Sequence, residues 1–149
     1  MNNTCTFTGH RNIKDFDQAL LDRVIENLIK NGCRRFYNGM ARGFDLAAAE
    51  SVLSFKKIYP DIELIACIPC PEQSQTFSAV DRERYKRALS GCSEKILLSD
   101  KYYSGCMFYR NRFMVDNADV IVSYLRKKFG GTYYTVRYAE KCGKKVIEL

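Results

Sequence analysis

Residues 36–50 read FYNGMARGFDLAAAE, and the rest of the chain is arranged around this stretch. A short apolar run ends at Gly39, Gly43 follows, and an alanine-rich segment after Asp45 predicts a helix. The order of strand, glycine loop and helix start places main-chain N–H groups and a positive dipole end beside Arg42. The two glycines let a ligand lie against the main chain. We expect a pocket for an anion such as phosphate; the alternative is a tight strand-to-helix connection.

The composition limits the class of protein. A length of 149 residues favours one domain, residues 1–149, and 46% hydrophobic residues suffice for a packed core. The start MNNTCTFTGH lacks the regions of a signal peptide, and no apolar run approaches the ~20 residues of a membrane span. The 7 cysteines, an odd number, fit buried reduced thiols. We therefore expect a cytoplasmic protein without membrane contact.

The net charge of +7 raises the question of nucleic acid. The 24 basic residues are, however, mixed with 17 acidic ones along the whole chain. A few arginines around one pocket explain the same total, so nucleic acid is the less favoured partner.

A metal or redox centre is not expected, and no cofactor is required. Cys67 and Cys70 form a CxxC pair, but Cys67 ends a strand, whereas a redox motif opens a helix. The single histidine, His10, is far away in sequence, and no second CxxC completes four zinc ligands.

Strand-like and helical segments alternate along the chain. Apolar β-rich runs occupy residues 4–8, 33–37, 62–68, 95–98, 119–124 and 145–149, and helical patterns about 15–31, 45–57, 78–90, 109–117 and 132–142. This predicts an α/β fold: a Rossmann-like, doubly wound, mostly parallel sheet of about six strands with helices on both faces. With strand order 3-2-1-4-5, strands one and four flank the point where the order reverses. The loops after strands one, two, four and five then meet over one crevice, where ligands bind.

The residues that follow these strands are the candidate ligand contacts. They are Gly9, His10 and Arg11; Gly39, Arg42, Gly43 and Asp45; Arg110, Asn111 and Arg112; and Gly130, Gly131 and Thr132. The last group is a second candidate anion nest, with a plain helix cap as the alternative. Arg110 and Arg112 diverge by roughly 200° on a helix, so only one is expected to face the pocket.

Several side chains suit more than one role. Asp45 fits a ribose contact, an acid or nucleophile at a sugar carbon, or a helix cap. Glu50 lies about 140° further around the helix, which weakens a two-carboxylate site. His10 suits phosphate orientation or proton transfer, or is only a polar loop residue. Loop aromatics either stack a base or pack locally; they are Phe77, Tyr102, Tyr103 and Tyr109.

Separated motifs resemble one superfamily. Residues 38–45 (NGMARGFD) are similar to the S-G-x-A-R-G-x-D loop of DprA/Smf proteins, 109–112 (YRNR) to their R-N-R segment, and 131–135 (GTYYT) to the loop closing the nucleotide site in the SLOG superfamily. The best match is the YpsA-like branch, through 8–11 (TGHR), 71–73 (PEQ) and 81–85 (DRERY) after Phe77. The resemblance implies a Rossmann-like fold, a nucleotide-derived ligand, and functional roles for Gly43 and Asp45.

One departure bears on catalysis. The LOG phosphoribohydrolases of this superfamily carry G-G-x-G-T-x-x-E, whereas here the spacer glycine is missing and Thr135 stands in place of the glutamate. The first hypothesis is therefore a sensor or sequestering module for a nucleotide or an ADP-ribose-like ligand. One alternative is an N-glycosidic hydrolase or transferase, with Asp45 or Glu50 as the catalytic residue at the sugar carbon and His10 assisting. The other is DprA-like single-stranded DNA binding. The sequence leaves open whether a reaction occurs, and a homo-oligomer is compatible with it.

Overall fold

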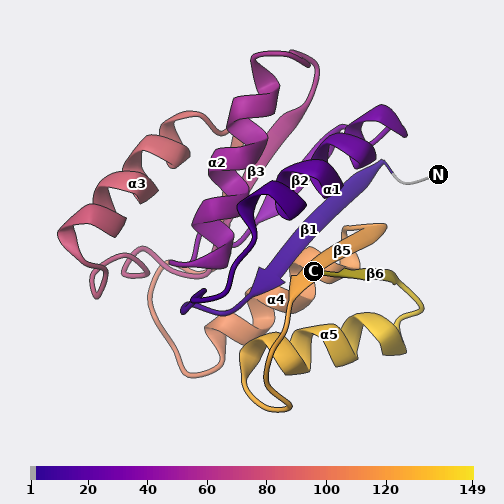
Figure 1. Cartoon of the computed structure of the whole chain (residues 1–149). Helices are drawn as coiled ribbons and strands as arrows, with labels where there is room; N and C mark the ends of the chain where they lie inside the picture. Colours follow the sequence, from indigo (N-terminus) through magenta and orange to yellow (C-terminus); the bar gives the residue numbers. More distant parts are fainter. Residues whose placement is uncertain (1–2) are drawn as a thin grey trace.

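The sheet is the frame of the molecule. The structure, a computed structural model, describes residues 3–149; residues 1 and 2 of the expected domain lie outside the described part. All strands are parallel, in the order β4-β3-β2-β1-β5-β6. Figure 1 labels all of these strands except β4. Their bounds are β1 Thr4–Gly9, β2 Arg35–Asn38, β3 Glu63–Ile68, β4 Glu94–Leu97, β5 Val120–Tyr124 and β6 Lys145–Glu148. The expected Rossmann-like α/β fold is confirmed.

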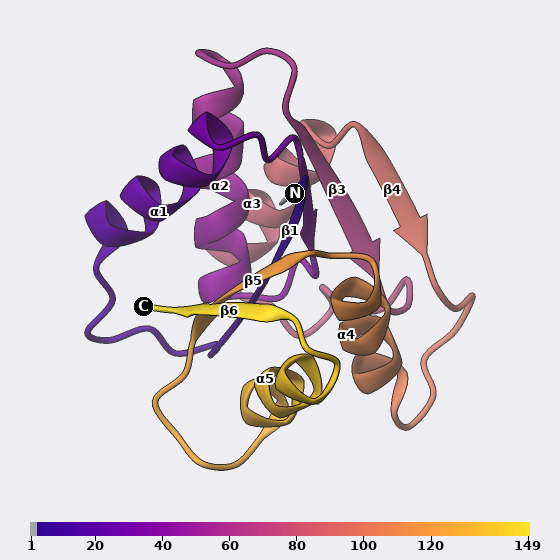
Figure 2. The same cartoon turned by 90° about the vertical axis from the view of Figure 1, so that its right-hand side faces the viewer.

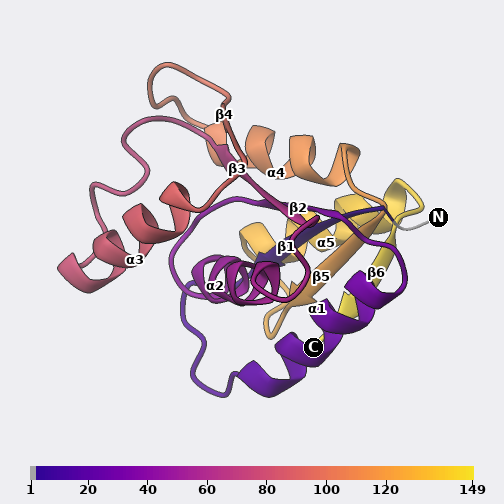
Figure 3. The ribbon, with the colours of Figure 1, turned by 90° about the horizontal axis from the view of Figure 1, so that it is seen from above.

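The helices cover both faces of the sheet. One face carries α1 (Gln18–Lys30), α2 (Phe44–Lys56) and α3 (Ala79–Ser90), and the other carries α4 (Cys106–Asp116) and α5 (Gly131–Lys141) (Figure 3). Right-handed crossovers between parallel strands produce this distribution when the chain reverses its direction across the sheet. Within residues 3–149, no helix is both long enough and apolar enough to cross a bilayer.

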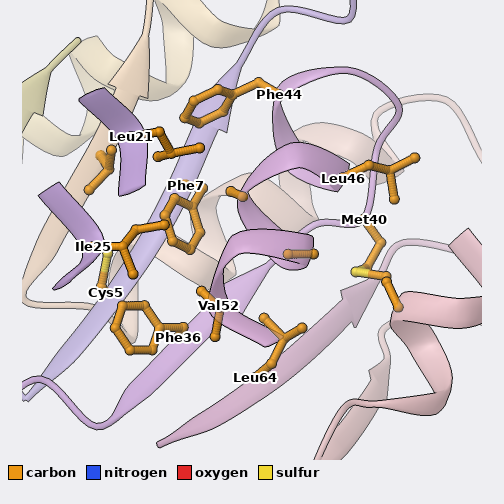
Figure 4. Packing of buried hydrophobic residues seen from close by; sticks show 14 of the residues in the cluster. Cys5, Phe7, Leu21, Ile25, Phe36, Met40, Phe44, Leu46, Val52 and Leu64 are labelled. Carbon is orange, nitrogen blue, oxygen red and sulfur yellow. The ribbon is translucent and has the colours of Figure 1, made fainter. Parts of the chain in front are cut away.

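The main core lies between the sheet and α1 and α2. Phe7 of β1 stacks on Phe36 of β2 with ring centroids 6.1 Å apart and meets Phe44 of α2 edge-on at 6.3 Å (Figure 4). The alanines of α2, among them the fully buried Ala48 and Ala49, let this helix pack closely on the strands. Phe44 stands at the first position of α2, so the same packing fixes where the helix begins beside the end of β1.

Side-chain caps define where α1 and α3 begin. Asp17 accepts a hydrogen bond from the Leu20 N–H at 3.1 Å, so α1 starts a few residues later than the helical pattern expected from about residue 15. Ser78 caps α3 by accepting from the Asp81 N–H at 3.1 Å, which agrees with the helical pattern expected over 78–90. Each cap satisfies a main-chain donor that the helix leaves free.

The expected strand order was wrong for the fourth strand. β4 pairs with β3 at the edge of the sheet, and β5 is the strand that lies beside β1 (Figure 2). Glu94 and Lys95 of β4 are exposed, and charged side chains suit an edge, where they discourage pairing with another chain. The strand order therefore reverses between β1 and β5, and α4 carries the chain from one side of this point to the other.

Candidate functional site

A cavity of about 470 Å³ opens at the carboxyl ends of β1 and β5. Segments that follow β1, β2 and β5 line it together with α4, so the predicted meeting of separate loops is observed. The candidate residues that line it are Gly9, His10, Arg11, Arg42, Asp45, Arg110, Asn111, Gly130, Gly131 and Thr132. The cavity thus lies where ligands bind in open α/β sheets.

The loop after β2 binds most of its own polar groups. The Asn38 side chain accepts from the Met40 N–H at 2.7 Å and donates to the Asp45 carbonyl at 2.8 Å. The Ala41 N–H donates to the Asp45 carboxylate at 3.2 Å. Met40 is buried with φ of 60°, a strained conformation for a side chain of this size. This loop therefore offers an anion fewer free N–H groups than its sequence suggests.

Gly43 and Gly9 are required because the loop after β1 crosses the start of α2. Gly43 has φ of +82°, and a Cβ there would lie 2.3 Å from the carbonyl oxygen of Arg11. A Cβ on Gly9 would lie 2.4 Å from the ring of Phe44. The Phe44 N–H donates to the His10 carbonyl at 3.1 Å. Gly43 therefore shapes the site from behind, without lining the cavity.

The start of α5 has the more open main-chain N–H groups. Its N-cap, Gly130, has φ of 93°, and among residues 3–149 no side chain caps the helix. The first N–H groups of a helix lack intrahelical partners, and here Gly131 and Thr132 line the cavity. The helices that line the cavity, α2, α4 and α5, all begin at glycines without a side-chain cap in the described chain. Of the two candidate anion nests, 130–132 is the better one.

Arg110 is a buried cation at the floor of the cavity. Only 4% of it is exposed, and its Nη1 donates to the carbonyls of Gly39 and, at 3.2 Å, of Cys67. Its Nε donates to Asn111 Oδ1 at 2.9 Å, and Nη2 has the weak acceptor Met107 Sδ at 3.9 Å. Arg110 thus clamps the ends of β2 and β3, and the edge at Nη2 has only this weak acceptor among the described residues. Burial lowers its pKa, and the nearby Asp45 opposes that shift.

The carboxyl group of Asp45 lies near this cation, on the other side of Gly39, without forming an ion pair with it. Burial raises its pKa to about 6, and Arg110, the Ala41 N–H and Arg11 oppose the shift. Among the described residues that line the cavity, Asp45 is the only acid, whereas the bases are Arg11, Arg42, Arg110 and Lys127. The cavity therefore favours an anion, and most strongly when Asp45 is protonated.

His10 joins the loops after β1 and β5. Its Nε2 accepts a hydrogen bond from the Arg126 N–H at 2.8 Å, which requires an unprotonated nitrogen. Burial, with Lys127 and Arg126, lowers the His10 pKa. His10 is therefore neutral near pH 7, and its Nε2 is occupied by the protein itself. This favours a positioning role over proton transfer.

A titration checks this assignment, because His10 is the single histidine of the chain. We expect NMR of its imidazole to give a pKa below the ordinary value of 6.5. Replacing Lys127 by alanine should raise that pKa, whereas Lys30→Ala on α1 should leave it unchanged. A value above 6.5 in the unaltered protein contradicts the hydrogen bond from Arg126.

Glu50 is not part of the cavity. Its carboxylate binds the Arg84 guanidinium through two hydrogen bonds of 2.7 and 2.9 Å, in a separate hollow beside α2 and α3. The spacing already weakened a two-carboxylate site, and the structure places Glu50 outside the cavity that Asp45 lines, because Arg84, from a helix later in the chain, holds it.

Phe77 and Arg112 also lie outside the cavity. Phe77 is buried and packs edge-on against Tyr85 with ring centroids 5.7 Å apart, so it cannot stack a base. Arg112 lies over the Tyr138 ring at 5.1 Å, in a groove between α4 and α5. The structure thus assigns the inward position to Arg110. Gly39 contributes its carbonyl to Arg110 without lining the cavity.

Lining residues that the sequence reasoning missed include Lys127, Phe129 and Phe108. The run RKKF at 126–129 stands directly after a central strand and before Gly130, and this position could have identified Lys127 and Phe129 as candidate lining residues. Phe129 and Phe108 are 65% and 49% exposed, so they are aromatic surfaces at the mouth of the cavity. The loop aromatics considered from sequence lie outside the lining; they are Tyr102, Tyr103 and Tyr109.

The cysteines are free thiols, and most are buried. In the part of the chain that the structure describes, no three His, Cys, Asp or Glu side chains are grouped to hold a metal ion.

A model of the YspA SLOG family matches residues 5–146. The chain belongs to this family. This SLOG chain is 37% identical over 131 residues to the uncharacterized SPbeta prophage-derived protein YoqJ of Bacillus subtilis, a match that covers 79% of the chain and 77% of YoqJ. It is 27% identical over 136 residues to the UPF0398 protein BH1768 of Halalkalibacterium halodurans, covering 89% and 71%.

Two solved structures share the fold of this SLOG chain. One is DNA processing protein A of Helicobacter pylori, whose single-stranded DNA binding mode has been described, with a TM-score of 0.71 at 20% identity. The other is DprA of Streptococcus pneumoniae, with a TM-score of 0.72 at 17% identity. The matches cover 99% of this chain but only 65% and 50% of those chains. At such identities the likeness concerns the fold.

Proposed function

We propose that the cavity binds a nucleotide-derived small molecule through its phosphate and that the protein is a sensor or a sequestering module for it. The observation that carries this proposal is that four basic side chains and the uncapped start of α5 line one cavity. The volume of about 470 Å³ falls within the usual range of ligand pockets.

Each group has a role in this proposal. The N–H groups at Gly131 and Thr132 and the free edge of Arg110 receive the phosphate. Arg11 and Arg42 are exposed and add charge at the rim. The Asp45 carboxylate accepts from a ribose hydroxyl.

Binding is favoured over hydrolysis by two contacts. Glu50 is held by Arg84, so the cavity has no second carboxylate from α2. His10 Nε2 already accepts from the Arg126 N–H. Inverting and retaining glycosidases alike use two carboxyl groups at the sugar, and the cavity offers Asp45 alone among the described lining residues.

Calorimetry with inorganic pyrophosphate and AMP tests the proposal. We expect both to bind, and Arg42→Ala to weaken pyrophosphate binding about tenfold, the usual effect of one lost charged contact. Arg23→Ala removes the same charge from exposed α1 and should change the affinity less than about twofold. If neither compound binds the unaltered protein after any bound ligand has been removed, the proposal is wrong.

The pH dependence of binding should report Asp45. Because its pKa is about 6, the carboxyl group becomes an anion as the pH rises through that value and then repels a bound anion. Pyrophosphate should therefore bind Asp45→Asn more tightly than the unaltered protein at pH 8 and about equally at pH 5. AMP should lose affinity in the same variant if Asp45 accepts from the ribose. An equal affinity of both proteins for pyrophosphate at pH 8 contradicts the repulsion.

Single-stranded DNA is the second candidate. It is supported by the fold shared with the DNA processing proteins and by basic and aromatic side chains beside the cavity, among them Arg112, Arg137 and Tyr134. Fluorescence anisotropy of a labelled oligothymidine at about 50 and about 200 mM salt tests it, since phosphate contacts weaken steeply with salt. No change in anisotropy even at the lower salt concentration ends this candidate.

A further inference from the structure

A second hollow adjoins the cavity. It is a groove of about 920 Å³ between α4 and α5, and Phe108 and Asn111 of α4 line both the groove and the cavity. On α5, Thr132 lines the cavity, whereas Lys141 lies at the far end of the groove. The rise of 1.5 Å per residue places these two positions ~14 Å apart along the helix. Cavity and groove therefore form one continuous depression.

The groove begins with an aromatic wall. The rings of Phe108 and Tyr134 meet at an angle of 68° with centroids 6.2 Å apart, joining the two helices. Tyr134 is 57% exposed, and Tyr138 follows one turn further along α5. Exposed apolar surface that gathers in a groove is typical of a binding site, and a base has a flat face that stacks on such rings.

The charges of the two hollows differ. In the groove, Arg137 pairs with Glu140 at 3.7 Å and the Arg112 guanidinium lies over the Tyr138 ring at 5.1 Å. In the cavity, four bases face one acid among the described lining residues. The groove is also lined by Lys141, so its described lining has three bases and one acid, and the positive charge is only somewhat greater in the cavity. The exposed rings of Phe108 and Tyr134 lie where the groove adjoins the cavity. A ligand with a charged centre and a planar ring beside it matches the uncapped start of α5 in the cavity and the rings that adjoin it.

We propose that the groove is a second subsite, which takes the base-bearing half of a nucleotide built from two sugars linked by a diphosphate. This inference rests on the proposed function, because the diphosphate lies in the cavity. The base stacks on Tyr134 beside Phe108, and Asn111, at the junction, faces the linking sugar. Tyr134 lies two residues after Thr132, ~3 Å along the helix axis, so a molecule whose diphosphate lies at the start of α5 reaches this ring with its base, which a lone phosphate does not.

Calorimetry of the full chain with three probes tests the inference: pyrophosphate for the cavity alone, AMP, and ADP-ribose for both hollows. We expect ADP-ribose to bind the unaltered protein at least about tenfold more tightly than pyrophosphate, because stacking adds to the phosphate contacts. Tyr134→Ala should weaken ADP-ribose about tenfold and leave pyrophosphate unchanged. Tyr109→Ala is the matched control, since Tyr109 is exposed on α4 and lines neither hollow.

The outcomes separate this inference from the function on which it rests. If pyrophosphate binds but Tyr134→Ala leaves the affinity for ADP-ribose unchanged, the groove subsite is wrong while the cavity proposal stands. If none of the three probes binds, both are wrong. If an oligothymidine binds more tightly than ADP-ribose and loses affinity in Tyr134→Ala, the groove serves a nucleic-acid strand, and the two-sugar nucleotide is wrong.

Discussion

Replacing Gly43 by alanine should lower the free energy of unfolding by about 3 kcal/mol. Two costs add at this position. The backbone has φ of +82°, which L side chains rarely adopt, and the new Cβ would lie 2.3 Å from the carbonyl oxygen of Arg11. Because main chain cannot rotate away as a side chain can, either the loop after β1 or the start of α2 must move. Urea unfolding followed by circular dichroism measures the loss.

Gly32→Ala separates the two costs. Gly32 ends α1 with φ of +104°, and nothing lies within 4 Å of its added Cβ. Gly32→Ala should therefore lower the free energy of unfolding by only about 1 kcal/mol, the cost of the backbone conformation alone. If Gly43→Ala and Gly32→Ala lower the free energy of unfolding by the same amount, the contact between Gly43 and the loop after β1 is not tight. In the expected case, Gly43→Ala should also weaken pyrophosphate binding, because Arg11 and His10 belong to the displaced loop.

Replacing Arg110 by methionine should cost about 2 kcal/mol of stability at pH 5 and about 1 to 2 kcal/mol more at pH 8. The loss at pH 5 comes from the carbonyls of Gly39 and Cys67, which lose a buried donor. The additional loss comes from Asp45. Its pKa is about 6 in the folded protein against an ordinary value of 3.8, so its ionisation opposes folding and stability falls as the pH rises between these values. Without the nearby cation that pKa rises further, and the fall continues above pH 6.

Urea unfolding at both pH values measures the two parts of this effect. The double variant Arg110→Met with Asp45→Asn should recover most of the additional loss at pH 8, because no buried anion remains. Arg112→Met is the matched control two residues along the same helix, and its exposed side chain predicts a change below about 0.5 kcal/mol at either pH. An Arg110→Met loss that is equal at pH 5 and pH 8 would show that Arg110 does not offset the charge of Asp45.

The alternation of segments predicted the α/β fold, because hydrophobic period and turn residues are local properties. The order of the strands is not local: residues 95–98 look equally apolar beside β1 or at an edge, and only pairing with β3 decides. The prediction that the loops meet at one cavity depended only on the strands being parallel. It was therefore correct although the predicted strand order was wrong.

Side-chain directions were the part that the sequence could not supply. The partner of Glu50 is Arg84 on the next helix, and the partner of Phe77 is Tyr85. Both are tertiary contacts that no spacing indicates. In the same way, main-chain N–H groups of the loop after β2 donate to the side chains of Asn38 and Asp45. The glycine-rich sequence suggested that these N–H groups are free to bind a ligand, but they form hydrogen bonds within the loop.

The central position of β1 has a consequence for when the cavity forms during synthesis. Thr6 of β1 pairs with Tyr37 of β2, which follows soon in the chain, but also with Ile121 of β5, which follows much later. Bringing such remote partners together slows folding. During synthesis, the edge of β1 that pairs with β5 therefore stays without its partner strand until β5 has left the ribosome. A molecule that binds at the junction of β1 and β5 recognises the finished chain alone, and its presence in the cell would protect newly made copies from degradation.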